Sequence, residues 1–191
     1  MNIYDPYPES VELDDKTYQL DLAFDVVLLA LDVAEDERLT RAQRIATQCA
    51  VLLRDDKECP EDTETQQRLL QLIYALFPEG DHSAERSIDF HQDAGKIRSG
   101  FFRIGIDLTK ERIHFFRFLE LLSDLPDDTA LMRTISIRTR PLPKPNKHNS
   151  EQIAELQKAK AKVAIKYGDG ERQRRFFESL KNSTLLTGGE R

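Results

Sequence analysis

Apolar residues recur along the chain at the three- and four-residue intervals of amphipathic helices. A helix over residues 18–33 is apolar on nearly every side, which predicts a central position in a bundle. Further apolar stripes predict helices over residues 40–53, 63–76, 89–104 and 109–122. The isoleucines of segment 129–140 are β-branched, so that segment fits either a helix or an extended chain. No segment is a clear strand, and we therefore predict an all-α fold, a compact multi-helix bundle.

Capping residues mark the expected helix ends. T-x-x-Q capping boxes are predicted at Thr40 with Gln43 and at Thr63 with Gln66. Asp89 is a candidate N-cap for the fourth helix, which should end at Gly105. Asp107 and Thr109 are candidate N-caps for the fifth. We expect residues 88–123 to form two antiparallel helices joined at Gly105–Thr109, with four side chains packed together: Phe101, Phe115, Phe118 and Leu122.

The composition changes after residue 140. Prolines alternate in PLPKPNKHN (141–149), which prevents a regular helix and favours an extended linker. The expected organisation is a helical domain followed by a linker, a C-terminal helix and a flexible basic tail, over residues 1–140, 141–150, 151–167 and 168–191.

Charge is distributed unevenly. Residues 1–93 carry 22 acidic and 8 basic side chains, and residues 94–191 carry 12 acidic and 20 basic ones, within a net charge of −6. The acidic excess argues against a general nucleic-acid or membrane-surface binder. Opposite charge on the two halves instead favours head-to-tail self-association. The sequence has neither a signal peptide nor an apolar run of membrane-spanning length, and Cys49 and Cys59 form no CxxC pair, so we expect a soluble intracellular protein.

Candidate catalytic chemistry is sparse. The four histidines, His82, His91, His114 and His148, lack the spacing of metal ligands, and no nucleophile or phosphate-binding motif is present. In the stretch GIDLTKERIHFFRF (105–118), the phenylalanines are expected in the core and His114 at its polar rim. A catalytic His114 would need an acid, and only Asp107 and Glu111 are near in sequence. We expect no enzymatic activity, no cofactor and no metal.

Protein binding is the favoured alternative. The basic second half could follow a nucleic-acid backbone, but it lacks interleaved aromatic residues and the acidic half would repel the ligand. We expect the partner-binding surface where apolar and basic side chains adjoin, at Phe116, Arg117, Leu121, Arg138, Arg174, Arg175, Phe176 and Phe177.

Several short motifs between Ile88 and Tyr167 occur in a characteristic order. They are GIDLT (105–109), HFF (114–116), LL (121–122), LPDDT (125–129) and IR (137–138), and the less specific IYALFP (73–78) precedes them. In this order they resemble the bacteriophage "gene product fifteen" family of siphophages that infect Gram-positive bacteria. Members of that family usually carry two tryptophans where this chain has Phe115 and Phe116, a change that keeps apolar bulk but removes the indole N–H.

The resemblance implies a product of the tail-gene cluster, encoded near the tape-measure gene and acting as a tail assembly chaperone. It brings no catalytic residues. We therefore expect a non-enzymatic protein in the host cytoplasm that binds the tape-measure protein or other tail proteins. The alternatives are a structural tail or neck component retained in the virion and, less favoured, a nucleic-acid-binding accessory protein.

Overall fold

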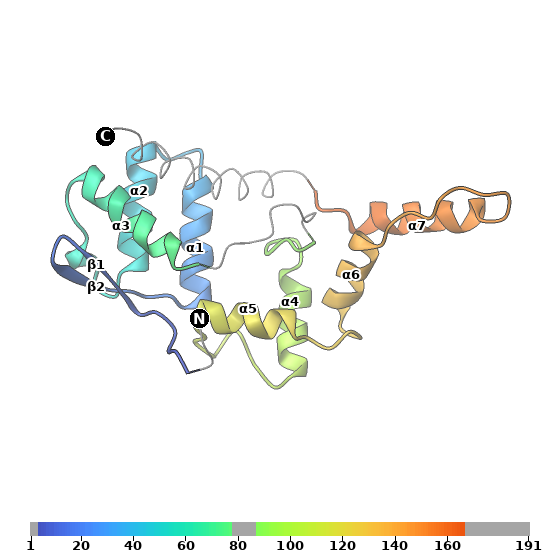
Figure 1. Ribbon diagram of the computed structural model, residues 1–191, viewed down its shortest axis with the longest axis horizontal. Coiled ribbons are helices and arrows are strands. Elements are labelled where there is room, and N and C mark those ends of the chain that lie inside the picture. The colour runs from blue at the N-terminus through green and yellow to red at the C-terminus, as the bar shows by residue number, and fades with distance from the viewer. Residues whose placement is uncertain (1–3, 78–86, 167–191) are drawn as a thin grey trace. The chain divides into compact units, whose positions relative to one another are not determined.

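The computed structural model describes residues 4–77 and 87–166. The chain divides into two compact units (Figure 1). Among the described residues, unit 1 consists of residues 4–77 and 112–119, and unit 2 consists of residues 87–111 and 120–166. These residues form seven α-helices and one two-stranded sheet, so the predicted helical fold is confirmed except for the sheet.

The sheet is an antiparallel hairpin at the start of unit 1. Strand β1 (Ser10–Leu13) pairs with β2 (Lys16–Gln19), with Val11 opposite Tyr18. Both turn residues, Asp14 and Asp15, have positive φ, as a two-residue hairpin turn requires. The predicted helix over residues 18–33 was therefore wrong at its N-terminal end, because Tyr18 belongs to β2 and the helix begins only at Phe24.

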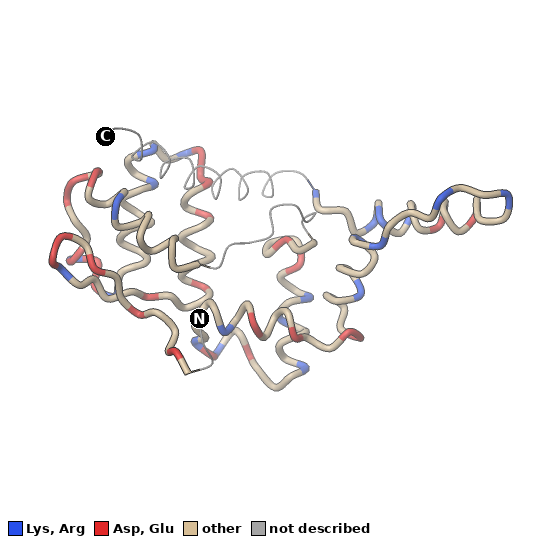
Figure 2. The backbone as a smooth tube through the Cα atoms, viewed as in Figure 1, with Lys and Arg blue, Asp and Glu red and all other residues tan. Residues whose placement is uncertain are grey.

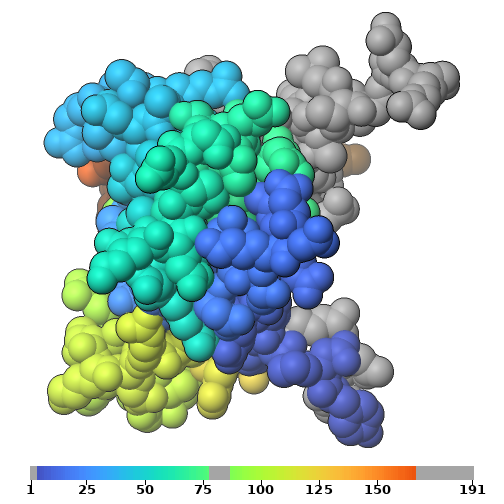
Figure 3. Space-filling view, turned by 90° about the vertical axis from the view of Figure 1, so that its left-hand side faces the viewer, coloured from blue at the N-terminus to red at the C-terminus, as the bar shows by residue number. Residues whose placement is uncertain are grey.

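Three helices complete most of unit 1: α1 (Phe24–Glu35), α2 (Arg41–Leu52) and α3 (Thr63–Ala75), with a short 3-10 helix, η1 (Asp56–Glu58), between the last two. The hairpin lies against α3 (Figure 3), and its alternate residues enter the core. Each helix contributes fully buried side chains to that core: Val27, Ala30, Cys49, Leu52, Leu69 and Ile73. The apolar surface of α1 is not buried all round, since Leu29 is 51% exposed.

One of the two predicted capping boxes exists. The Thr40 hydroxyl accepts from the Gln43 N–H at 3.3 Å, and the Gln43 side chain accepts from the Thr40 N–H at 2.9 Å. The box at Thr63 and Gln66 was wrong. Asp62 caps α3 instead, because its carboxylate accepts from the Thr65 N–H at 2.7 Å, while the buried Gln66 side chain donates to the Pro60 carbonyl.

Unit 2 begins with α4 (Ala94–Arg103), which starts later than predicted. Asp89 caps the preceding turn instead, accepting from the backbone N–H groups of His91 and Gln92 at 3.0 and 2.7 Å. The predicted end at Gly105 is confirmed. Gly105 has φ of +86°, and the N–H groups of Gly105 and Ile106 donate to the carbonyls of Phe102 and Phe101, which is a Schellman motif.

The next helix, α5 (Phe115–Ser123), also starts later than predicted, and the boundary between the units falls within it. Neither Asp107 nor Thr109 caps it. The Asp107 carboxylate accepts from the Thr109 N–H and hydroxyl at 3.1 and 2.7 Å, which closes a local turn. The four side chains expected to pack together are all buried, but Phe115 and Phe118 belong to unit 1, whereas Phe101 and Leu122 belong to unit 2.

The segment with β-branched residues is helical. Helix α6 (Ala130–Thr139) is capped by Thr129, whose hydroxyl accepts from the Met132 N–H at 3.2 Å. After the proline-rich segment comes α7 (Ser150–Val163). The Asn149 side chain accepts from the Asn146 N–H and donates to the Lys144 carbonyl, so it closes the turn before that helix.

Within the described ranges, no helix combines the length and apolar character needed to cross a membrane.

Candidate functional site

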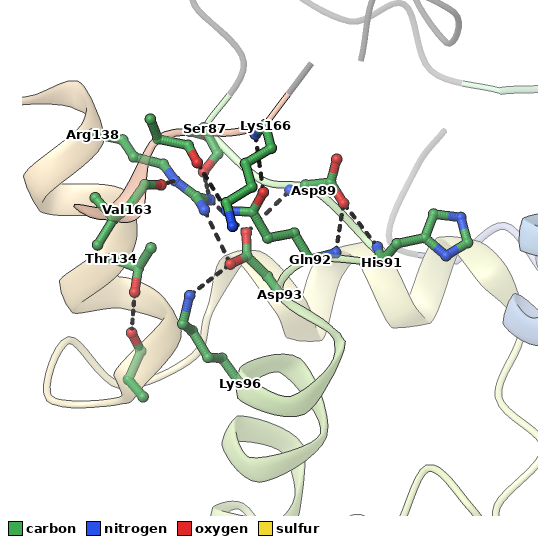
Figure 4. Close-up of polar contacts among 12 residues, drawn as sticks. Ser87, Asp89, His91, Gln92, Asp93, Lys96, Thr134, Arg138, Val163 and Lys166 are labelled. Atoms are coloured by element: carbon green, nitrogen blue, oxygen red, sulfur yellow. Dashed lines mark hydrogen bonds and ion pairs between the residues drawn. The ribbon is translucent and has the colours of Figure 1, made fainter. Parts of the chain in front are cut away.

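Unit 2 contains a buried ion pair (Figure 4). Arg138 extends from α6 to Asp93, the residue just before α4. The Asp93 side chain is 0% exposed and that of Arg138 is 6% exposed. The guanidinium forms two hydrogen bonds to the carboxylate, one from Nη1 to Oδ2 and one from Nη2 to Oδ1 at 3.1 Å. This two-point geometry is the strong form of an arginine–carboxylate contact.

The same guanidinium holds two further segments. Its Nε donates to the Val163 carbonyl at the end of α7 at 2.6 Å, and its Nη1 donates to the Ser87 carbonyl at 2.8 Å. Gln92 reinforces this arrangement, since its side chain donates to the Ala164 carbonyl and accepts from the Lys166 N–H. Arg138 therefore joins α6, the start of α4 and the end of α7.

Asp93 is fully engaged by donors. Besides Arg138, its carboxylate accepts from Lys96 Nζ at 2.7 Å and from the Asp89 N–H at 3.1 Å. Burial opposes ionisation, but the hydrogen bonds from Arg138, Lys96 and the Asp89 backbone outweigh it and lower the pKa of Asp93. A carboxylate held ionised by these donors is a poor proton acceptor, so the geometry fits a link between segments of unit 2 better than a general base.

A second polar group, in unit 1, surrounds His114. Its Nδ1 accepts from the Phe116 N–H at 3.2 Å, which caps the start of α5, and its Nε2 lies 3.1 Å from the Pro8 carbonyl. These partners assign the proton to Nε2. The ring stacks on Tyr7 with centroids 4.8 Å apart. His114 therefore lies at the polar rim of the core, as predicted, and its hydrogen bond orders the start of a helix.

His114 also borders an open pocket of about 460 Å³. Its charged lining residues form ion pairs with one another, Arg54 with Glu9 at 2.7 Å and Arg112 with Asp21. The remaining lining residues are Pro8, Leu20, Leu22 and Ala23. No cysteine, serine or threonine lines the pocket to act as a nucleophile. In the parts of the chain described, no group of three or more His, Cys, Asp or Glu residues could hold a metal ion.

Unit 2 exposes an apolar surface at the end of α4. The Phe102 side chain is 71% exposed and Ile104 is 38% exposed, with the exposed Arg98 one turn before Phe102. Sequence reasoning missed Phe102. The signal was present, however, because Phe102 lies outside the apolar stripe of Ile97 and Phe101, about 100° round the helix from Phe101. Exposed aromatic rings beside arginine are common in protein-binding surfaces.

The residues predicted to bind a partner have different environments. Phe116 is 8% exposed and contacts Tyr7 and Phe77, and Arg138 is buried in the ion pair, so both contribute to packing. Arg117 is exposed and Leu121 is half-buried on α5. Four residues lie outside the described part of the chain: Arg174, Arg175, Phe176 and Phe177.

Comparison with known proteins identifies the family. The sequence model of the family described as "Bacteriophage Gp15 protein" matches residues 3–165, which confirms the resemblance seen in residues 88–167 and extends it through unit 1. No protein of curated function and no solved structure matches the chain. The family match places the chain among phage proteins of the structural or tail-related kind. Because the matched span covers most of the 191 residues, the chain belongs to the Bacteriophage Gp15 protein family.

Proposed function

We propose that the protein is a non-enzymatic tail assembly chaperone that binds the tape-measure protein in the host cytoplasm while the phage tail is built. The observation that supports this proposal is the exposed apolar surface of Phe102 and Ile104 in a phage family protein. Exposure of 71% of this ring to water is unfavourable, and burial against an apolar helix of a partner would lower the free energy.

The expected affinity of one such contact is modest. Burial of a phenylalanine side chain contributes roughly 1.5–3 kcal/mol, and part of that is lost to the entropy of association. Several copies bound side by side along one long partner would hold it together, although each copy binds weakly. Weak individual contacts also suit a chaperone, because tail subunits must displace it when they polymerise.

The backbone around Phe102 is well ordered for recognition. The Schellman motif fixes the C-terminal turn of α4, and Gly100 on the opposite side of the helix lies against Leu125, where an added Cβ would be 2.9 Å from the leucine Cδ1. The buried face of α4 is therefore closely packed, which holds the exposed face in one orientation. A preformed surface avoids part of the ordering cost of binding.

The test is co-expression with the tape-measure protein. We expect the wild-type chain to keep its partner soluble and Phe102→Asp to lose this effect, because a charge at the centre of the contact cannot be desolvated without a partner. Leu29→Asp is the matched control. Leu29 is also an exposed apolar residue of a helix, at 51%, but it lies on α1 of unit 1. Equal solubility with wild type and Phe102→Asp would reject this surface as the binding site.

The composition of the virion decides between chaperone and structural component. A chaperone leaves when the tail is complete, so we expect mass spectrometry of purified particles to find the tape-measure protein without this chain. Stoichiometric copies of the chain in the particle would overturn the chaperone proposal in favour of a retained tail or neck component.

A further inference from the structure

The proline-rich segment and α7 form an arm, defined as residues 140–166, which the structure describes completely. Helix α7 has no buried side chain, and Asn149 is the one buried residue of the arm. Fourteen residues make a helix that is marginal in isolation, and contact with α6 and the hydrogen bonds to Arg138 support this one. Because the arm buries almost no side chain, it contributes little to the core, and its surface is available to a partner.

The arm is nevertheless anchored at both ends. It leaves α6 just after Arg138, and the Arg138 side chain holds the Val163 carbonyl where the arm returns. A second hydrogen bond links the two ends, since Lys160 Nζ of α7 donates to the Arg138 carbonyl of α6. Figure 1 shows α7 extending away from α4 and α6 within unit 2. Arg138, which forms the buried ion pair with Asp93, thus also holds the exposed arm in a fixed position.

Positive charge dominates this element (Figure 2). The arm carries seven lysine and arginine residues against two glutamates. Six of the seven are exposed: Arg140, Lys144, Lys147, Lys158, Lys162 and Lys166. Apolar side chains lie between them on α7, where Ile153, Leu156 and Val163 are only half-buried. A surface of this kind matches an acidic protein surface with some apolar character.

Unit 1 carries an acidic surface, which we call the acidic end and define as residues 12–16 and 55–64. It contains nine aspartates and glutamates against two lysines. The two segments are contiguous in space, because Lys16 Nζ donates to the Glu58 carbonyl at 3.4 Å. Eight of the nine acidic residues are exposed, and only Glu58 is half-buried. The two segments thus concentrate negative charge on one part of unit 1 (Figure 2).

We propose that the arm of one copy binds the acidic end of a second copy. The two surfaces differ, so the contact is heterologous and leaves a free arm at one end of the pair and a free acidic end at the other. Further copies can then add in the same direction. This inference does not depend on whether the partner is the tape-measure protein. It also explains why the fold anchors an arm that adds little to its core.

Salt dependence and charge reversal test the contact. Light scattering of the wild-type chain should report masses well above 22.1 kDa at about 0.1 M salt and single chains at about 1 M, where the Debye length falls from about 10 Å to about 3 Å. Lys158→Glu/Lys162→Glu should remain a single chain at both concentrations. The matched control, Lys110→Glu/Arg133→Glu, makes the same change in net charge at exposed residues of unit 2 outside the arm, and it should associate like wild type.

Complementation tests the heterologous geometry. Asp56→Lys/Glu61→Lys reverses charge at the acidic end but keeps the arm, and the Lys158→Glu/Lys162→Glu chain keeps the acidic end. Neither variant should associate alone. Their mixture retains one native contact, so it should recover association, with pairs of about twice the chain mass as its smallest assembly.

Three results would overturn the proposal. They are a wild-type mass that does not change with salt, an arm variant that associates like wild type, and a mixture that stays monomeric although both variants show the wild-type circular dichroism spectrum. Retention on immobilised DNA that the arm variant loses, with association unchanged, would instead assign the arm to nucleic acid.

Discussion

Replacement of Arg138 by methionine tests whether the buried ion pair holds unit 2 together. Methionine keeps much of the apolar volume of the arginine stem but removes the charge and every hydrogen bond of the guanidinium. The change removes the bidentate partner of Asp93, whose side chain is fully buried. It also removes the donor to the Ser87 and Val163 carbonyls.

The expected cost follows from what remains. Removal of one partner from a buried ion pair typically costs about 3–5 kcal/mol, because the other charge stays buried without compensation. Here Lys96 still donates to Asp93 at 2.7 Å, so we expect a value near the lower limit, about 3 kcal/mol. That is a large share of the total stability of a folded protein, which is usually about 5–15 kcal/mol.

Urea unfolding followed by circular dichroism measures this loss, and Arg103→Met supplies the matched control. Arg103 pairs with Asp128 in the same unit, but the two side chains are 51% and 63% exposed, so its loss should cost less than about 1 kcal/mol. Hydrogen exchange should localise the effect. The amides at the end of α7 should lose protection in Arg138→Met, because the Val163 carbonyl no longer has its donor.

Two outcomes would refute this reasoning. One is a cost below about 1 kcal/mol for Arg138→Met, and the other is an equal cost for the buried and the exposed arginine. The double variant Asp93→Asn/Arg138→Met provides a further check. Since both changes act on the same ion pair, the double variant should be more stable than the sum of the two single losses implies.

Three further predictions concern Asp93, Phe118 and His114. The pKa of Asp93 is lower in the folded than in the unfolded state, so its ionised form stabilises the protein above the unfolded-state pKa of about 3.9. This contribution should be lost as the pH falls through the folded-state pKa. The urea-unfolding free energies of wild type and Asp93→Asn should therefore converge in acid. Phe118→Ala should cost about 3–5 kcal/mol in the same assay, because the ring is 1% exposed and stacks on Phe24, and a loss below about 1 kcal/mol would show that the ring is not part of a core. His114→Gln should keep the fold but lower stability by about 1 kcal/mol through loss of the helix cap, and elemental analysis should find no stoichiometric metal; a bound metal in the wild type would contradict this.

Features that depend on neighbouring residues could be predicted from the sequence. The capping box at Thr40 and the helix end at Gly105 follow from local hydrogen bonding and from the freedom of glycine at positive φ. Burial of Phe115 and Phe118 follows from helical spacing, since residues three apart share one face. The order of short motifs also indicated the family that the match over residues 3–165 shows.

Other local signals were misleading because a neighbouring residue offered a competing arrangement. Asp62, not Thr63, is the N-cap of α3, and Tyr18 belongs to the hairpin instead of the first helix. In each case the sequence allowed both arrangements. The hydrogen bonds of the capping carboxylate and the pairing of Tyr18 with Val11 selected one of them.

The arrangement of the charged residues was decided by the tertiary structure alone. The sequence determined that the first half is acidic and the second basic, and it marked Arg138 as one arginine among several. Only the fold placed that arginine against Asp93, 45 positions away, and left the lysines of α7 exposed. Nothing in the neighbouring residues distinguishes a buried arginine from an exposed one. The difference arises because desolvation is tolerated only where a distant carboxylate and two backbone carbonyls compensate for it.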